Sequence, residues 1–507
     1  MNPISYSSLL KLVAPETIVI IAALAVLSID LLAMRAAPRR YRFWIGALFA
    51  GVGCVVAIVW LLTMNLPPHS PADRAGLAFM PGMFVDNTLV RLVKVILLVM
   101  TVFTVVISME TNFTVHIGEY LALILLATAG MMFLVSAEDL LMVFIALELI
   151  SLSLYILTAF NKRNIQSAEA ALKYFLFGGM AAAFTLFGLS FVYGLAGSTQ
   201  FAEIAARLSG AKPLDPLLLA AIVMTVIGFG FKVAAVPFHL WAPDVYQGAP
   251  TPAAAFIASG SKVAGFFIFA RLMMLAFSSA EGSAAWRHLV AGWMPVVAVV
   301  AACSMILGNL AAIVQGNVKR LLAYSAIANA GYALLGLLSN NQTGMASLIY
   351  YVATYGLTVL GAFAVVAILE ERAGEATLAS FAGLGRREPL LAFCMMIFML
   401  SLAGIPPLAG FFGKFYLFTA AAGAVKDLGL LWLVIIAIGM SAVSLYYYLQ
   451  VVKQIYVVPA PEGLPRISVP ASSRVVLVLL ALAMVVLGCA PNLLVARILA
   501  AMGAAGF

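Results

Sequence analysis

The sequence is dominated by a succession of apolar runs, separated by short polar connections. A run of about 20 apolar residues crosses the roughly 30 Å hydrocarbon layer of a bilayer as a helix. In lipid, every span must satisfy its own backbone hydrogen bonds, which helices do and open strands do not. The runs therefore predict an all-α integral membrane protein with about fourteen transmembrane helices.

Composition agrees with membrane insertion and excludes several other classes of protein. Hydrophobic residues make up 64% of the chain and charged residues 9%, far from the balance of a soluble domain. The net charge of +8 comes from basic residues scattered through short connections, so nucleic acid is not an expected partner. The four cysteines lie in apolar runs without a CxxC pair, and no disulfide, iron–sulfur or zinc site is predicted.

Lysine and arginine are more frequent in the connections after odd-numbered helices than in those after even-numbered helices. By the positive-inside rule, the odd-numbered connections are cytoplasmic and both termini lie on the periplasmic side. The N-terminus lacks the features of a cleaved signal peptide, so we expect the first run to remain as a span. A short interfacial helix is predicted near residues 199–209.

Residues 228–262 are the most informative stretch, because Lys232 and Lys262 lie in apolar sequence on either side of a Pro- and Gly-rich turn. At 1.5 Å per residue, both lysines lie roughly 15–22 Å from the surface that carries the turn, which is near the midplane. An ionisable residue at that depth is a functional hypothesis by default. Pro237 interrupts the helix, and His239 follows it as a shuttle between the lysines or as a satisfied polar group.

Five charges remain inside the predicted spans once those near helix ends are set aside: Glu148, Lys173, Lys232, Lys262 and Lys414. Burial lowers the pKa of a lysine, and a neighbouring carboxylate raises it. A carboxylate that moves would therefore switch a buried lysine between holding and releasing a proton. The alternative is a static ion pair that fixes helix packing.

An internal repeat is also visible. Gly228-Phe-Gly-Phe-Lys232 and Gly410-Phe-Phe-Gly-Lys414 share the pattern G-F-x-x-K, each with prolines close by. The first copy lies on the seventh predicted helix and the second on the twelfth, so the two run in opposite orientations. Inverted repeats with broken helices near the midplane are a common architecture of transporters. We interpret Asp244 as a structural residue at a helix end, and the tyrosines at 446–448 as packing residues.

Three stretches carry a family resemblance: the run GFGFKVAAVPFHLWAPDVYQGAPTP, residues 317–336 (NVKRLLAYSAIANAGYALLG) and residues 402–418 (LAGIPPLAGFFGKFYLF). They closely resemble the antiporter-like subunit N of bacterial NADH–quinone oxidoreductase, respiratory complex I. The resemblance implies two inverted five-helix repeats with broken helices 7 and 12. It divides the chain into an N-terminal three-helix segment (1–115), a first repeat (116–280), a second repeat (290–460) and a C-terminal helix (470–507).

The resemblance also implies a role for each site residue. Glu148 and Lys232 would be the interacting pair of helices five and seven, and Lys173 would modulate it. Lys262 would be the central connecting lysine and Lys414 the exit-side lysine, with His239 between the lysines of helices seven and eight. In one departure, Asn329 stands where relatives often have histidine, which argues against a protonatable relay on the tenth helix.

The implied function is that of a proton-translocating membrane subunit of NADH:quinone oxidoreductase in the bacterial inner membrane. No cofactor is expected in this chain, since FMN, iron–sulfur clusters and quinone would belong to partner subunits. The partners would be other membrane subunits of complex I, including neighbouring antiporter-like subunits, and the lipid bilayer. Two alternatives are a subunit of a multi-subunit sodium/proton antiporter and a non-pumping structural subunit of a hydrogenase-like membrane complex.

Overall fold

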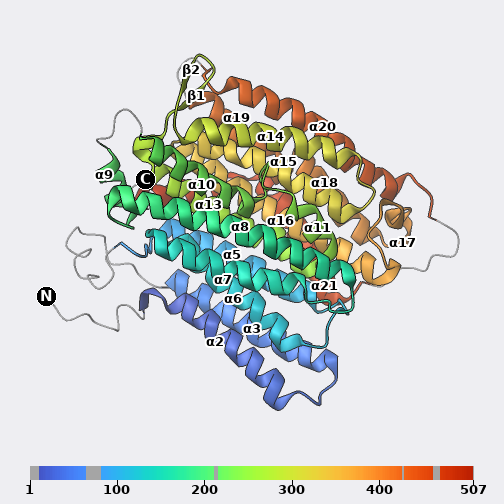
Figure 1. Ribbon diagram of the computed structural model, residues 1–507. Coiled ribbons are helices and arrows are strands. Elements are labelled where there is room, and N and C mark those ends of the chain that lie inside the picture. The colour runs from blue at the N-terminus through green and yellow to red at the C-terminus, as the bar shows by residue number, and fades with distance from the viewer. Residues whose placement is uncertain (1–10, 64–81, 210–214, 425–427, 461–468, 506–507) are drawn as a thin grey trace.

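The computed structural model describes residues 11–63, 82–209, 215–424, 428–460 and 469–505, which are almost entirely helical (Figure 1). Thirteen helices in these ranges are long and apolar enough to cross a membrane. The twelfth predicted span is divided into two shorter helices, so the predicted count and the all-α membrane fold are confirmed. The long helices lie side by side along a common direction, with the N-terminal helices at one edge (Figure 1).

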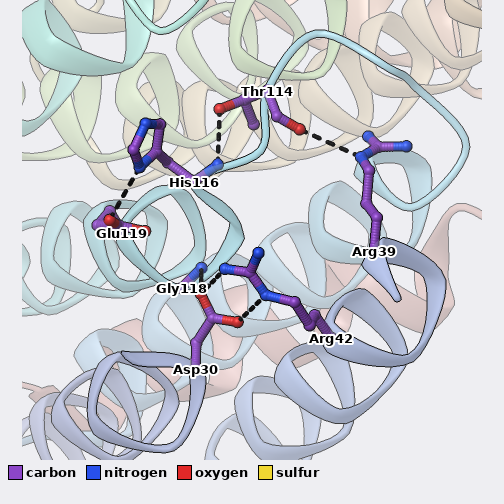
Figure 2. Close-up of polar contacts among 7 residues, drawn as sticks. All are labelled: Asp30, Arg39, Arg42, Thr114, His116, Gly118 and Glu119. Atoms are coloured by element: carbon purple, nitrogen blue, oxygen red, sulfur yellow. Dashed lines mark hydrogen bonds and ion pairs between the residues drawn. The ribbon is translucent and has the colours of Figure 1, made fainter. Parts of the chain in front are cut away.

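The N-terminal segment contains three spans: α2 (Ala14–Ser28), extended by the π-helical turn η1 (Ile29–Ala33), α3 (Arg39–Thr63) and α5 (Thr88–Ser108). The buried carboxylate of Asp30 joins these helices to the next one. Arg42 donates to both its oxygens at 2.7 and 2.6 Å, and the backbone N–H of Gly118 donates at 2.9 Å (Figure 2). Asp30 thus fixes α2 against α3 and against the start of α6 (Ile117–Ser136).

The first repeat begins with α6. The short helix that the sequence predicts near residues 199–209 is present as α9. Its remaining helices are α7 (Leu140–Thr158), α8 (Ile165–Ala196), α9 (Phe201–Leu208), α10 (Pro216–Val233), α11 (Trp241–Gly248), α12 (Thr251–Ala258) and α13 (Gly260–Arg271). The turns η2 (Leu272–Ala276) and η3 (Ser278–Ala280) follow. A small antiparallel hairpin then leads to the next helix, with β1 (Ser283–Ala285) paired to β2 (His288–Val290) in the register Ser283↔Val290.

The second repeat surrounds a helix that is buried on almost all sides, α16. Its elements are α14 (Trp293–Ile313), α15 (Val318–Leu338), α16 (Gln342–Ala373), η4 (Leu378–Phe381), α17 (Leu384–Arg387), α18 (Pro389–Ala403), α19 (Ala409–Gly423) and α20 (Leu431–Tyr456). The C-terminal segment has two helices, α21 (Ala471–Cys489) and α22 (Asn492–Ala505), where the sequence predicted one. Pro491 separates them, because proline cannot continue a helix.

The seventh and twelfth helices are both broken, as predicted, and both breaks begin with the same cap. The residue that caps the end of α10 is Ala234, with φ +58°, and the residue that caps α18 is Gly404, with φ +85°. In each, the next backbone N–H bonds a carbonyl five residues earlier: Ala235 to Gly230 and Ile405 to Leu400. This is the Schellman arrangement, which satisfies carbonyls at a helix end buried in the bundle.

These caps show that the two G-F-x-x-K motifs are not equivalent. When Ala234 is matched to Gly404, Pro237 matches Pro407 and Asp244 matches Lys414, each at the same spacing from its cap. Lys232 lies before its break, whereas Lys414 lies after its own. The motif match predicted from the sequence is therefore wrong in register, because glycine and phenylalanine are too frequent here for so short a pattern to be specific.

Candidate functional site

Lys232 lies in the last turn of α10 and is 4% exposed. Its Nζ donates to the hydroxyl of Ser151 on α7 at 3.3 Å. Glu148 lies one turn before Ser151 on the same helix and is half-buried. No ion pair joins the carboxylate of Glu148 to Lys232 in the described ranges, so the structure brings the expected pair into one region without contact.

Lys173 differs from the buried residue that the sequence predicted. Its side chain on α8 is 39% exposed, and its Nζ lies 2.7 Å from Glu169 and 2.7 Å from Asp244. The other carboxylate oxygen of Asp244 lies 2.7 Å from Arg320, at the start of α15. Asp244 therefore holds Lys173 and links the first repeat to the second. The sequence of α11 does not indicate this role of Asp244, because Lys173 and Arg320 are far from Asp244 along the chain.

Lys262 lies near the start of α13, just after Ser259 interrupts the eighth helix, and is 2% exposed. Its Nζ donates to the backbone carbonyl of Ala326 on α15 at 2.9 Å and lies 5.9 Å from the ring centroid of Tyr355. His239 lies in the break between α10 and α11 and is also buried. Its Nδ1 makes no hydrogen bond with the described part of the chain.

Lys414 reaches back across the break of the twelfth helix. Its Nζ donates to the carbonyls of Leu402 and Ala403, at 3.0 and 3.2 Å, and to the hydroxyl of Ser441 at 3.0 Å. The two carbonyls lie at the C-terminal end of α18, where the helix dipole favours a positive charge. The same amine lies 5.1 Å from the ring centroid of Tyr332. Lys414 is therefore fixed by α18, although it belongs to α19.

Buried polar side chains fill the space between Lys262 and Lys414. Asn329 on α15 donates to the carbonyl of Ser325 at 2.7 Å and accepts from Tyr351 at 2.6 Å. Tyr448 on α20 shares a 2.5 Å hydrogen bond with the hydroxyl of Ser325. The sequence interpretation of Tyr448 as a packing residue missed this contact. Asn329 is thus a member of a hydrogen-bonded network, although it cannot titrate.

A second part of this network lies beside Lys414. The amide of Asn309 on α14 donates to the hydroxyl of Tyr332 at 3.0 Å and accepts from Tyr447 at 3.0 Å. The rings of Tyr447 and Tyr448 are 4.4 Å apart, so the two parts of the network adjoin. Tyrosine in an apolar helix is usually a core residue, so these positions could not be singled out from the sequence.

Three charges that the sequence placed near connections are buried. Lys94 lies 2.7 Å from Glu16, with both side chains at most 3% exposed. Arg271 donates to Glu138 at 2.5 Å and is 1% exposed. Lys319 lies 2.7 Å from Glu370. Within the described residues, no group of three His, Cys, Asp or Glu side chains is placed to hold a metal ion.

Comparison with known proteins places this arrangement in a family. Residues 137–442 match the model of the family described as NADH:quinone oxidoreductase/Mrp antiporter, TM. NADH-quinone oxidoreductase subunit N 2 of Acidobacterium capsulatum is 51% identical, over 97% of this chain and 99% of that protein. A chain of respiratory complex I from Thermus thermophilus is 32% identical, with a TM-score of 0.75 over 95% of this chain and 98% of its own length.

A chain of the Mrp complex from Dietzia sp. shares the fold, with a TM-score of 0.80 over 97% of each chain at 21% identity. The family model spans more than half of the sequence, and the Acidobacterium protein matches almost end to end. The chain therefore belongs to the NADH:quinone oxidoreductase/Mrp antiporter family, as a relative of NADH-quinone oxidoreductase subunit N.

Proposed function

We propose that this chain is a proton-translocating subunit of a membrane complex that oxidises NADH and reduces quinone. One observation carries the proposal. Lys232, Lys262 and Lys414 are each at most 5% exposed, and none forms an ion pair in the part of the chain that the structure describes. An unpaired ammonium is very costly to bury, so each amine is expected to spend part of a working cycle neutral. Three such amines, on the interrupted helices seven, eight and twelve, suit stepwise proton transfer.

The surroundings of each residue and the family resemblance support a role for it. Lys232 would exchange a proton with the interior when Glu148 approaches it, and Lys173 would tune that approach. His239, buried in the break, would relay between Lys232 and Lys262. The network that contains Asn329 and Tyr448 would carry the proton from Lys262 toward Lys414. The resemblance supports two inverted repeats at 116–280 and 290–460, with 1–115 and 470–507 as flanking segments.

Electron transfer would take place in partner subunits, which would supply FMN, iron–sulfur clusters and quinone. The relatives named as subunits of NADH-quinone oxidoreductase support this assignment. The chain would lie in the bacterial inner membrane beside other membrane subunits, with both termini on the periplasmic side, as the positive-inside rule favours.

The second candidate function is a subunit of a sodium/proton antiporter. The shared fold with a chain of the Mrp complex favours it, although that likeness extends to the fold alone. The two functions differ in their driving force, because an antiporter subunit exchanges protons for sodium without NADH. Proton movement that needs a sodium gradient and ignores NADH would favour this alternative.

The test is proton pumping by the complete complex in sealed inside-out membrane vesicles, measured together with NADH:quinone turnover. Lys232→Ala is compared with Lys453→Ala, a matched loss of an exposed lysine in the last turn of α20. We expect Lys232→Ala to assemble normally and to lose pumping and coupled turnover, while Lys453→Ala resembles the unaltered chain. If Lys232→Ala pumps normally, the lysine is a structural charge and the proposal fails.

A further inference from the structure

A polar cavity of about 490 Å³ lies between the two repeats, on the face where the odd-numbered connections meet. Its walls come from the connections after α5, α7, α11, α14 and α16. Amide and carboxylate side chains line it, and the volume has room for more than a dozen water molecules at about 30 Å³ each. The site described above does not use this cavity.

Acidic residues at the end of α16 form one wall of the cavity. Glu371 and Glu375 are exposed, and Asn112 donates to Glu371 through its backbone N–H at 3.2 Å and its amide at 2.7 Å. The Asn112 contact holds one carboxylate at the opening. Carboxylates at the mouth of a cleft raise the local concentration of cations, including protons.

Three side chains on the cavity wall form what we call the floor cluster: Thr251, Lys319 and Glu370. Lys319 Nζ lies 2.7 Å from Glu370 Oε1 and 3.3 Å from the hydroxyl of Thr251, which donates to the other oxygen of Glu370. Lys319 is 4% exposed, whereas the side chain of Glu370 is 31% exposed. The lysine thus lies behind a carboxylate that water can reach.

Helix stability does not explain these two charges. Lys319 is the second residue of α15, where the helix dipole disfavours a cation, and Glu370 lies in the last turn of α16, where it disfavours an anion. Each charge is therefore stabilised by the other across the interface between helices. Protonation of Glu370 would remove that stabilisation and loosen the contact.

Two buried hydroxyls lie beyond the floor cluster. Tyr246 on α11 contacts the ring of Phe363 on α16, about 10 Å along α16 from Glu370 at 1.5 Å per residue. Tyr355 lies about 12 Å further along the same helix, where its ring faces Lys262. Neither hydroxyl has a hydrogen-bond partner within the described ranges. Tyr246 and Tyr355 both lie along α16 between Glu370 and Lys262.

We propose that this cavity is the proton-uptake site of the chain, and that protons pass from Glu370 by way of Tyr246 and Tyr355 to Lys262. The proposal rests on the proposed function and adds a route that reaches Lys262 without passing Lys232. Glu370 accepts a proton from water and gives it to the route. Each tyrosine hydroxyl accepts one proton and releases its own, directly or through a bridging water, and the neutral amine of Lys262 gains one. No charge remains on the tyrosines.

The route is tested with Tyr355→Phe, which removes one hydroxyl and keeps the ring, and with Glu370→Gln. The matched controls are Tyr350→Phe and Glu388→Gln. Tyr350 lies on the same helix as Tyr355, and its hydroxyl donates to the backbone carbonyl of Leu487 on α21. Glu388 lies outside the cavity. Pumping and turnover are measured in inside-out vesicles and normalised to assembled complex. We expect both route variants to pump roughly tenfold more slowly, equivalent to about 1.4 kcal/mol in the barrier, and both controls to match the unaltered chain.

Two further variants separate failure of this route from failure of the proposed function. If Lys262→Ala loses pumping while Tyr355→Phe and Glu370→Gln pump normally, the chain pumps but the route is wrong. If Lys262→Ala also pumps normally, the proposed function itself fails. Glu375→Cys tests the side of uptake: a membrane-impermeant cationic thiol reagent should slow pumping when added outside inside-out vesicles. Pumping unaffected by full modification of that cysteine would overturn the assignment of the cavity.

Discussion

Asp244→Asn separates a positioning role from a proton-carrying role, because the substitution keeps the shape and removes the charge. The carboxylate contacts Lys173 and Arg320, both at 2.7 Å, and all three side chains are roughly one third exposed. Exposed ion pairs are worth about 0.2–1 kcal/mol each, and the amide still offers one acceptor oxygen. The loss should therefore be about 1 kcal/mol, or roughly fivefold in the equilibrium between positions of Lys173.

This magnitude sets the expected result in the pumping assay. Asp244→Asn should lower coupled proton pumping by no more than about fivefold, with normal assembly, because Lys173 keeps its contact with Glu169. Asp215→Asn is the matched control, since Asp215 caps the start of α10 and asparagine caps helices equally well. If Asp244 acts through Lys173, the double variant with Lys173→Gln should be no slower than Lys173→Gln alone.

A collapse of pumping in Asp244→Asn to the level expected of Lys232→Ala would refute this reasoning. It would mean that Asp244 itself carries protons, as its correspondence to Lys414 in the two matched breaks would then suggest. Additive losses in the double variant would also contradict it, because residues that act through one another are not additive.

Three other predictions concern stability and the polar network. Lys94→Met should lower the free energy of unfolding by about 3–5 kcal/mol by leaving Glu16 buried and uncompensated, whereas the double variant with Glu16→Leu should regain most of it, as thermal unfolding in detergent would report. Tyr448→Phe should slow pumping with a cost of about 1 kcal/mol per lost hydrogen bond, and a normal rate would remove it from the proton path. Ala234→Gly should raise the free energy of unfolding and Gly404→Ala should lower it, by about 1 kcal/mol each, because both positions have left-handed backbone. Thermal unfolding in detergent would report both changes, and equal effects of one sign would contradict this.

The spans, the two broken helices and the lysines could be predicted from the sequence, because the length of an apolar run and a charge within it are local properties. The contacts of those lysines could not. Lys232 donates to Ser151 rather than to Glu148, although Ser151 and Glu148 lie within one turn of each other on α7. Which of the two accepts the hydrogen bond depends on how the side chains pack. Hydropathy also failed to separate buried Arg271 from a loop charge, since its partners Val135 and Glu138 lie at the end of α6 and in the connection that follows it.

The register of the repeat shows a different limit of sequence reasoning. A left-handed residue at a helix end is usually glycine, and Gly404 fits that expectation, but the equivalent position in the first repeat is Ala234. Without glycine as a marker, the five-residue motif gave a false alignment. The conformation of the backbone, rather than any shared side chain, identifies which residues correspond.

The placement of the lysines relative to the breaks has a consequence for direction. Two inverted halves that matched residue for residue would be interchangeable when the molecule is turned over, and neither face of the membrane would be distinguished. Here Lys232 precedes its break and Lys414 follows its own, on helices that run in opposite directions, so the backbone of both lysines lies toward the same face. The opposite face has Asp244 and the acidic end of α16 instead. The chain thus has a built-in polarity before any partner subunit binds. The amines of Lys232 and Lys414 lie toward one compartment, and carboxylates that are paired with Lys173, Lys319 and Arg320 lie toward the other.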